Sequence, residues 1–226
     1  MPPKMTATVT VVIFYFDRTL IDGDSDRWVV TEMGLLDLFN QLRSTLPWNS
    51  LMDRMMKELH SQGKTADDIA ESLKKTPVNP RTAAAIKSAY ALGCDLRILS
   101  DANQFFIDKI LEHHGLLGCF SKIYTNPSYV EEGRLRIFPY LHMAAVYVQL
   151  ICARQPNFIY LGDGSGDYCP TLKLRDSDYV MPRKNYPLWN RIFSDRASVK
   201  AEVHEWSNGE ELERILLHLI NRISSE

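Results

Sequence analysis

The sequence predicts an α/β protein with a parallel sheet, helices on both faces of that sheet, and a small inserted helical cap. Three observations predict it. Short apolar runs alternate with segments of helical periodicity along most of the chain, an order typical of parallel sheets. Residues 28–79 contain helical patterns only. The 226 residues, 45% of them hydrophobic, are enough for one core with a smaller attached module.

The strands are expected where short apolar runs, several rich in Val and Ile, are flanked by polar or turn-forming residues. The predicted strands are residues 8–16, 95–100, 122–125, 157–162 and 178–181. Helical spacing of apolar residues fills most of the gaps. The predicted core helices are residues 83–92, 104–114, 141–154, 186–193 and 209–223, the last capped by Ser207 or Asn208.

The cap is predicted from the missing strands between residues 28 and 79. Its expected helices are residues 31–43, 50–60 and 65–74, the last opened by Thr65 with acidic residues in its first turn. Pro80 suits the first position of the next helix. We therefore expect a core formed by residues 1–27 and 80–226 and a cap formed by residues 28–79.

Composition and charge limit the kinds of partner expected for this chain. The formal net charge is -2 and the pI is about 6.3, without the basic field typical of nucleic-acid binders, so no nucleic-acid partner is expected. The four cysteines are far apart, without zinc-ligand spacing, and are expected to be reduced. The N-terminal apolar run is too short for a membrane span, so we expect no membrane partner and a cytoplasmic location.

Three motifs follow predicted strands. The first strand ends at Tyr15, with Asp17 two residues later; Ser100 and Asp101 follow the second; a glycine-rich turn after the fourth carries Asp163 and Asp167. The carboxyl ends of parallel strands share the edge at which α/β sheets bind ligands. Each motif alone also fits an ordinary helix cap or turn, but their order and spacing together indicate a phosphate site.

With these motifs the chain resembles the haloacid dehalogenase (HAD) superfamily of phosphatases. Residues 16–30 resemble its phosphocholine and phosphoethanolamine phosphatase group, which includes plant proteins. The match extends over nearly the whole chain through residues 100–103, 124–127, 162–164 with 167–170, and 179–184. The resemblance implies a Rossmann-like core with a helical cap. It also implies Mg²⁺-dependent hydrolysis of small phosphorylated metabolites, such as phosphocholine, phosphoethanolamine, pyrophosphate or phosphorylated vitamins, through an aspartyl-phosphate.

The resemblance also implies roles for individual residues. Asp17 would be the general acid/base and, through its backbone carbonyl, a magnesium ligand, and Ser100 would contact the phosphate. Asp163 would bind the magnesium ion directly. Asp167 would belong to the same metal site and support it as the next carboxylate outward from the ion.

Asp26 and Asp101 occupy positions that the family uses near an amine headgroup. Negative potential at the mouth of the site favours a cationic substrate end. The alternative is that these acids only form loops and cap helices.

Two departures from the family pattern put catalysis in doubt. Tyr15 stands where the attacking Asp is expected; a neutral Tyr hydroxyl is a poor nucleophile and offers one oxygen where a carboxylate offers two. The family lysine between the second and last motifs is also missing, because no lysine occurs between Lys122 and Lys173. The corresponding residues 140–154 form an apolar stretch, shorter than the family's, in which Arg154 is the one candidate substitute.

Two functions follow from these observations. The first is a HAD-type phosphatase that is impaired or inactive because of Tyr15 and the missing lysine, with Mg²⁺ binding weakened or lost. The second is a non-catalytic protein that binds a small phosphorylated metabolite or regulates a partner. Homo- or hetero-oligomerisation through the apolar helix at residues 141–151 is left open.

Overall fold

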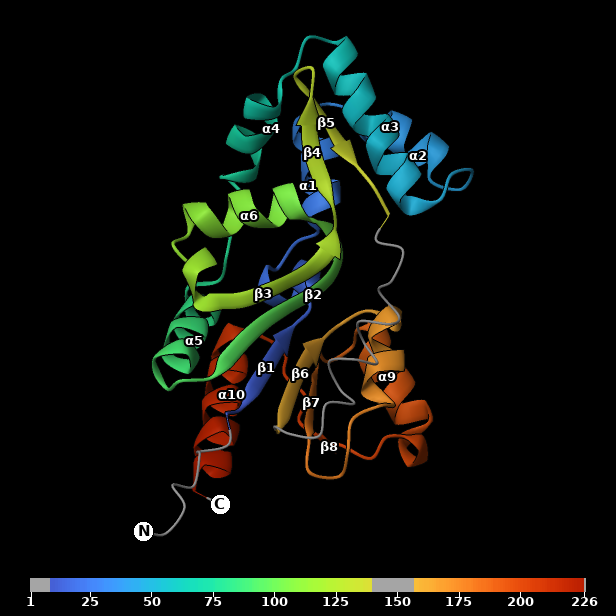
Figure 1. The fold of residues 1–226 in the computed structure, drawn as a ribbon. Coiled ribbons are helices and arrows are strands. Elements are labelled where there is room, and N and C mark those ends of the chain that lie inside the picture. Colours follow the sequence, from blue (N-terminus) through green and yellow to red (C-terminus); the bar gives the residue numbers. More distant parts are fainter. Residues whose placement is uncertain (1–8, 140–156, 226) are drawn as a thin grey trace.

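A computed structural model describes residues 9–139 and 157–225 of the chain. It contains a six-stranded sheet with the order β3-β2-β1-β6-β7-β8, in which every neighbouring pair is parallel (Figure 1). The strands are β1 (Val11–Phe14), β2 (Asp95–Asn103), β3 (Phe120–Asn126), β6 (Phe158–Gly162), β7 (Tyr179–Pro182) and β8 (Glu202–Val203). The predicted α/β fold is confirmed. The edge strand β8 was not predicted, because two residues carry no readable periodicity.

The central strand β1 shows why this sheet needs a layer of helices on each face. Val12 and Phe14 pack in one core and Val11 and Ile13 in another, and all four are almost fully buried. The first core includes side chains of α5 (Pro80–Ala91), α6 (Gln104–His113) and α10 (Gly209–Ser224), and the second includes those of α9 (Pro187–Ser194). Figure 1 shows α5 and α10 on one face and α9 on the other. Continuous apolar strands are typical of such doubly covered sheets.

Helix starts follow the predicted capping chemistry. Thr65 forms a capping box with Asp68 at the start of α4 (Ala66–Leu73). Pro80 is the first residue of α5, as predicted, and Asn208 rather than Ser207 caps α10 through a 3.0 Å bond from the Glu211 N–H. The predicted helix at residues 141–154 lies outside the described residues. No helix in the described ranges is long and apolar enough to cross a bilayer.

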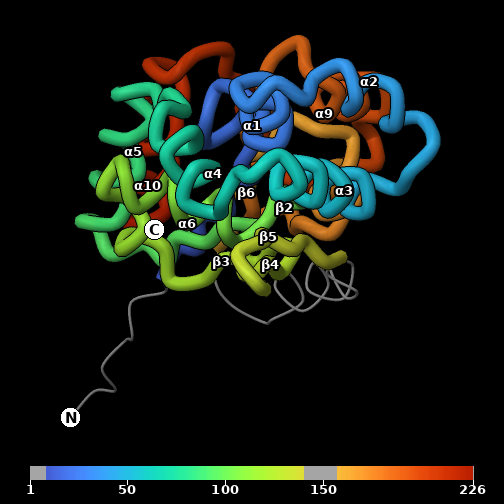
Figure 2. The backbone as a smooth tube through the Cα atoms, turned by 90° about the horizontal axis from the view of Figure 1, so that it is seen from above, coloured from blue at the N-terminus to red at the C-terminus, as the bar shows by residue number. Residues whose placement is uncertain are grey.

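Above the carboxyl edge of the sheet lie four helices and a hairpin (Figures 1 and 2). The helices are α1 (Ser25–Glu32), α2 (Leu36–Leu42), α3 (Trp48–Ser61) and α4. Residues 28–79 contain no strand, as the pattern predicted. The first of these helices begins three residues before the predicted cap boundary.

The hairpin was not predicted. It consists of β4 (Ser128–Glu131) and β5 (Arg134–Ile137), joined by Glu132 and Gly133, which both have positive φ. Two such residues are typical of the tightest hairpin turns, and Glu-Gly was the available sequence signal. The hairpin lies beside α3, so a segment that follows β3 in the chain packs with helices that precede β2.

Asp53 of α3 holds this hairpin. Its carboxylate accepts hydrogen bonds from Arg134 (2.7 Å), Arg136 (3.1 Å) and the Ile137 N–H (3.2 Å). Hydrogen bonds to a charged, partly buried group are among the stronger ones in proteins. Asp53 therefore joins two segments that are about 80 residues apart in the sequence.

We expect Asp53→Ala to lower the free energy of unfolding by about 1–3 kcal/mol. It removes the carboxylate partner of the largely buried Arg134, while Arg136 keeps its ion pair with Glu131. Urea unfolding measures this change. The matched control on the same helix is Glu58→Ala, which removes a partly exposed 3.5 Å ion pair with Arg54 and a long, 3.3 Å hydrogen bond from Gln62. It should change stability by less than about 0.5 kcal/mol. Equal effects of the two substitutions would contradict the anchoring role.

Candidate active site

The predicted site residues lie in loops at the carboxyl edge of the sheet. Tyr15 and Asp17 follow β1, Asp101 lies in the last part of β2, and Asp26 is at the start of α1. These four side chains line one cavity of about 280 Å³. Its other walls come from Arg18, Asp24, Arg43 and Trp48. The structure thus brings together residues that are up to 86 positions apart.

The loop after β1 is fixed by bonds along its backbone. Arg18 has a φ of 56°, a conformation that costs a non-glycine residue roughly 1 kcal/mol. Its N–H donates to the Gly23 carbonyl (2.8 Å), its guanidinium to Asp24 (2.6 Å), and its carbonyl accepts from Arg183 (2.5 Å). These contacts hold the strained turn and set the direction of the side chains on either side of it.

Tyr15 fills the position directly after β1. Its N–H donates to the Leu161 carbonyl of β6 (2.9 Å), and its hydroxyl donates to the Asp101 carboxylate. Burial and the negative charge of Asp101 hold the Tyr15 pKa well above its ordinary value of 10. The hydroxyl is therefore a neutral donor at physiological pH, with its proton directed at a carboxylate.

Asp17 is buried at the floor of the cavity. One of its oxygens accepts from the Ser25 N–H at 2.7 Å, at the start of α1. Burial, with the charge of Asp24, raises the pKa of Asp17 to about 8. A carboxyl group with such a pKa can carry a proton at neutral pH, as a general acid must.

Asp163 and Asp167 lie in the loop after β6, outside the residues that line the cavity. Thr19 donates to Asp163 at 3.1 Å, and burial raises the Asp163 pKa to about 6. Asp167 accepts from the Tyr160 hydroxyl (2.6 Å) and from the N–H groups of Asp163 (3.0 Å) and Gly164 (2.8 Å). Both Asp167 oxygens thus bind the chain itself and support the Asp163 loop. A metal-ligand role for Asp167 stays a prediction.

Ser100 is fully buried in β2, and its hydroxyl accepts from the Ala102 N–H at 3.2 Å. It does not line the cavity in this structure, so its predicted phosphate contact stays a prediction. The backbone beyond it is held by Asn126 of β3, whose side chain donates to the carbonyls of Asp101 (2.6 Å) and Ala102 (2.8 Å). Asn49 of α3 in turn donates to Asn126 at 3.1 Å and ties this edge to the helices above.

The two predicted headgroup acids both face the cavity. Asp26 is 3% exposed, and one of its oxygens accepts from the Trp48 indole at 2.6 Å. Its other oxygen is buried without a partner among the described residues. Burial and the charge of Asp17 hold the Asp26 pKa well above its ordinary value. Trp48 and Arg43 were not predicted as site residues, because neither belongs to a strand-end motif; their place depends on how α2 and α3 pack above the sheet.

The described residues do not supply a complete magnesium site. Mg²⁺ binds oxygen ligands, and carboxylates are its usual protein donors. No group of three or more His, Cys, Asp or Glu side chains in residues 9–139 and 157–225 is arranged to hold a metal ion. Asp17 retains the backbone carbonyl and Asp163 the carboxylate of the expected site, while the position after β1 carries a phenol that is bonded to Asp101. The donor set thus lacks one carboxylate of the expected site. Arg154, the candidate substitute for the missing family lysine, lies outside the described residues.

Comparisons with known proteins show which sequences this chain resembles. The chain is 56% identical over 238 residues to the thiamine phosphate phosphatase-like protein of Arabidopsis thaliana, covering 96% of this chain and 97% of that protein. It is 50% identical to inorganic pyrophosphatase 2 of the same plant, covering 95% of this chain and 85% of that protein. The first alignment is longer than the 226 residues present here, so that relative carries residues without a counterpart in this chain.

A solved structure shows the same fold. The HAD family hydrolase of Salmonella enterica subsp. enterica serovar Typhi superimposes with a TM-score of 0.67 at 16% identity, covering 95% of this chain and 72% of that one. The sequence model of the Putative Phosphatase family matches residues 10–220, which is most of the chain. This chain therefore belongs to the Putative Phosphatase family, and its fold is that of HAD hydrolases.

Proposed function

We propose that this chain is a HAD-type phosphatase in which hydrolysis of small phosphorylated metabolites is impaired or lost because Tyr15 replaces the attacking carboxylate. One observation carries the proposal: the Tyr15 hydroxyl sits at the carboxyl end of β1, inside the cavity, and donates its hydrogen to Asp101. The retained cavity and the family relatives support the phosphatase origin.

The chemistry of Tyr15 is the reason for the impairment. An aspartyl-phosphate forms when a carboxylate oxygen attacks phosphorus. The phenol would have to lose its proton first, and the surroundings of Tyr15 raise its pKa. Asp17 is placed to donate a proton to the leaving group. Without an attacking carboxylate no aspartyl-phosphate forms, so this proton transfer alone does not lead to hydrolysis by that route.

The cavity favours a substrate with a cationic end. Asp26 and Asp101 face the same space as Asp17, and the Trp48 indole forms part of its wall. A negatively charged carboxylate and an aromatic face both attract organic cations. Asp101 supplies the charge, because the raised pKa of Asp26 favours its uncharged form. Thiamine phosphate, phosphoethanolamine and phosphocholine share a positive centre and a phosphate, and the name of one relative includes the first of them. We place pyrophosphate lower, because it has no cationic end.

The second candidate is a non-catalytic protein that binds such a metabolite or regulates a partner. The observation that favours it is the intact cavity around Tyr15: side chains from the β1 loop, β2 and α1 to α3 still enclose about 280 Å³. A degenerate site without a ligand would not be expected to keep a buried carboxylate such as Asp26 facing into it. Binding without turnover separates this candidate from the first.

The test is phosphate release from thiamine monophosphate, phosphoethanolamine, phosphocholine and pyrophosphate with Mg²⁺ present, alongside calorimetry with the same compounds. We expect no release above the uncatalysed rate if Tyr15 has abolished the chemistry, and only slow release if it has impaired it. Binding in the calorimeter without release favours the second candidate. Turnover at rates ordinary for enzymes, above about 1 per second, would overturn both.

Mg²⁺ affinity gives an independent prediction. We expect this chain to bind Mg²⁺ at least about tenfold more weakly than its Tyr15→Asp variant, because a neutral phenol oxygen replaces a charged carboxylate. Isothermal titration with Mg²⁺ measures the difference. Tyr15→Asn is the matched control, since it removes the ring without adding the charge and should stay weak. Equal affinities for the chain and Tyr15→Asp would contradict this prediction.

A further inference from the structure

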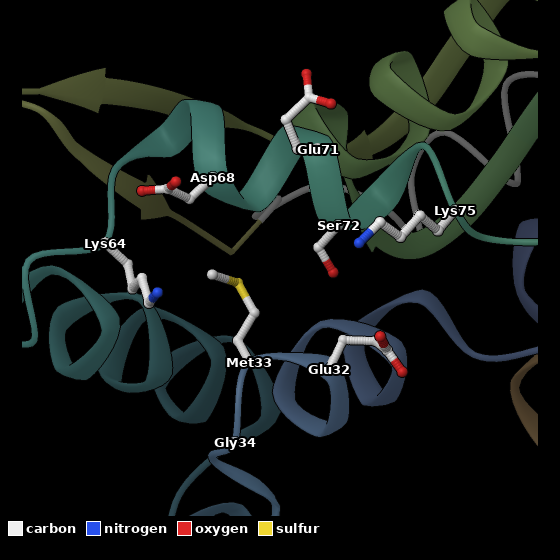
Figure 3. A pocket seen from close by; sticks show the side chains of 8 residues that line it. All are labelled: Glu32, Met33, Gly34, Lys64, Asp68, Glu71, Ser72 and Lys75. Carbon is white, nitrogen blue, oxygen red and sulfur yellow. The ribbon is translucent and has the colours of Figure 1, made fainter.

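Two cavities of this protein differ in how far their positive charges are already paired. The larger one, of about 400 Å³, lies between α1 and α4 (Figure 3). Lys64 already acts on the carboxylate of Asp68 in the same lining. Lys75 likewise acts on Glu71. The candidate active cavity, of about 280 Å³, is lined by two arginines, and one of them has no partner among the described residues.

Arg43 is this unpaired arginine. It directly follows α2, where its N–H donates to the Phe39 carbonyl at 2.9 Å, so that helix sets its backbone position. Across residues 9–139 and 157–225 its guanidinium forms no hydrogen bond or ion pair. The other arginine, Arg18, donates to Asp24 at 2.6 Å. A guanidinium presents a planar set of N–H donors that matches a phosphate group, and that of Arg43 lines the cavity.

The sheet side of the cavity suits a phosphate poorly. Tyr15 and Asp101 form this side, and the Tyr15 hydroxyl donates to the Asp101 carboxylate. The lysine that the family resemblance implies is missing, since no lysine occurs between Lys122 and Lys173. A phosphate at the end of β1 would therefore lie beside a carboxylate, and like charges repel each other. Arg43 lies on the opposite side, because α2 belongs to the helices above the sheet edge (Figures 1 and 2).

Asp101 and Trp48 provide a position for a positive charge. A carboxylate has about four acceptor positions, so the bond from Tyr15 leaves others on Asp101. The Trp48 ring is held in the cavity wall by an edge-to-face contact with Phe39, at 5.7 Å between ring centres, and by the 2.6 Å bond to Asp26. A carboxylate and an aromatic ring both attract organic cations. The cavity therefore has separate positions for a cation and for an anion.

We propose that Arg43 binds the phosphate of a zwitterionic ligand, while Asp101 and Trp48 hold its cationic end. The ligand is the small phosphorylated amine of the proposed function, so the role of Arg43 rests on that function and adds the residue that selects the phosphate. In this arrangement the phosphate lies on the helix side of the cavity, away from the position of the missing nucleophile. The chain then holds the ligand without magnesium and without transferring its phosphate.

Isothermal titration in the presence of EDTA tests this arrangement with three probes. Phosphocholine carries both charges, choline only the positive one, and inorganic phosphate only negative charge. We expect phosphocholine to bind at least about tenfold more tightly than either of the others, because each of those lacks one charge contact. No heat from phosphocholine at millimolar concentration would overturn the proposal. Binding that appears only when Mg²⁺ replaces the EDTA would also overturn it.

Arg43→Met tests whether the phosphate lies against Arg43. It should weaken phosphocholine and inorganic phosphate at least about tenfold and leave choline within about twofold. The matched control is Arg27→Met, which removes the same charge from the exposed side of α1, outside the lining of this cavity. It should change phosphocholine affinity by less than about twofold, because salt screens charges at the surface. Equal losses for the two variants would overturn the proposal.

Asp101→Asn tests which end of the ligand lies on the sheet side. Its amide oxygen can still accept from Tyr15, so the main change is the loss of charge. We expect choline to bind at least about fivefold more weakly and inorganic phosphate to stay within about threefold. A larger gain for phosphate would place the anion beside Asp101 and overturn the proposal, as would unchanged affinity for choline.

Failure of this proposal and failure of the proposed function give different results. Turnover with Mg²⁺ at rates ordinary for enzymes would overturn the proposed function, whichever variant binds. Unchanged phosphocholine affinity in Arg43→Met would overturn only the role of Arg43, because the titrations do not measure phosphate release.

Discussion

Replacing Tyr15 by Asp is expected to raise phosphate release with Mg²⁺ by at least about 10³-fold over the chain as it stands. The reason is that removing a covalent nucleophile typically costs several orders of magnitude in rate. The loop that would aim the new carboxylate is already fixed by Gly23, Asp24 and Arg183. Asp17 is already buried beside it, and burial raises its pKa to about 8, a value suited to a general acid at neutral pH. Initial rates with thiamine monophosphate and phosphoethanolamine measure the gain.

The control is Tyr15→Asn, which opens the same space and breaks the bond to Asp101 but provides no nucleophile. We expect no gain from it. A gain equal to that of Tyr15→Asp would show that the ring only blocked the cavity. If Tyr15→Asp binds Mg²⁺ and the substrate but gives no phosphate, the missing family lysine also disables the site, because loss of a charge that stabilises the transition state costs about 10²-fold or more.

Gly162→Ala is expected to lower the free energy of unfolding by about 3 kcal/mol. A Cβ at Gly162 would lie 2.6 Å from one carboxylate oxygen of Asp167. That oxygen accepts from the N–H groups of Asp163 and Gly164, and Asp167 is fully buried. The carboxylate cannot move aside without breaking those bonds. Thermal and urea unfolding measure the loss.

Gly166→Ala is the matched control in the same loop. An added Cβ there meets no atom within 4 Å, so we expect a change of less than about 0.5 kcal/mol. A similar loss for both substitutions would mean that the loop tolerates no side chain at all, and that the contact between Gly162 and Asp167 is not the cause.

The sequence predicted the features that follow from local apolar patterns, but not the contacts that depend on how helices pack. The strands before Tyr15, Asp101 and Asp163 were predictable because buried parallel strands are continuous apolar runs, and parallel order brings their carboxyl ends to one edge. Trp48 and Arg43 were not, because their place in the cavity depends on the packing angles of α2 and α3. No local periodicity encodes such angles.

The role of Asp167 shows a similar limit. The glycine-rich pattern by itself fits either a metal site or an ordinary turn. The distances to Tyr160, Asp163 and Gly164 show that the carboxylate supports its own loop in this structure. The hairpin was missed for another reason: four-residue strands are too short for alternation to stand out, and the Glu132–Gly133 turn was the better indicator.

The bond network of Asp53 also constrains how this protein can be recombined with its relatives. A chimera that exchanges residues 28–79 alone would set Arg134 and Arg136 against a foreign helix, since their carboxylate partner would leave with the exchanged block. Exchanging the helices of residues 28–79 together with the β4–β5 hairpin between family members therefore requires two separate stretches of the gene. One stretch precedes β2 and the other follows β3. In evolution, the helices and the hairpin are expected to change as a pair.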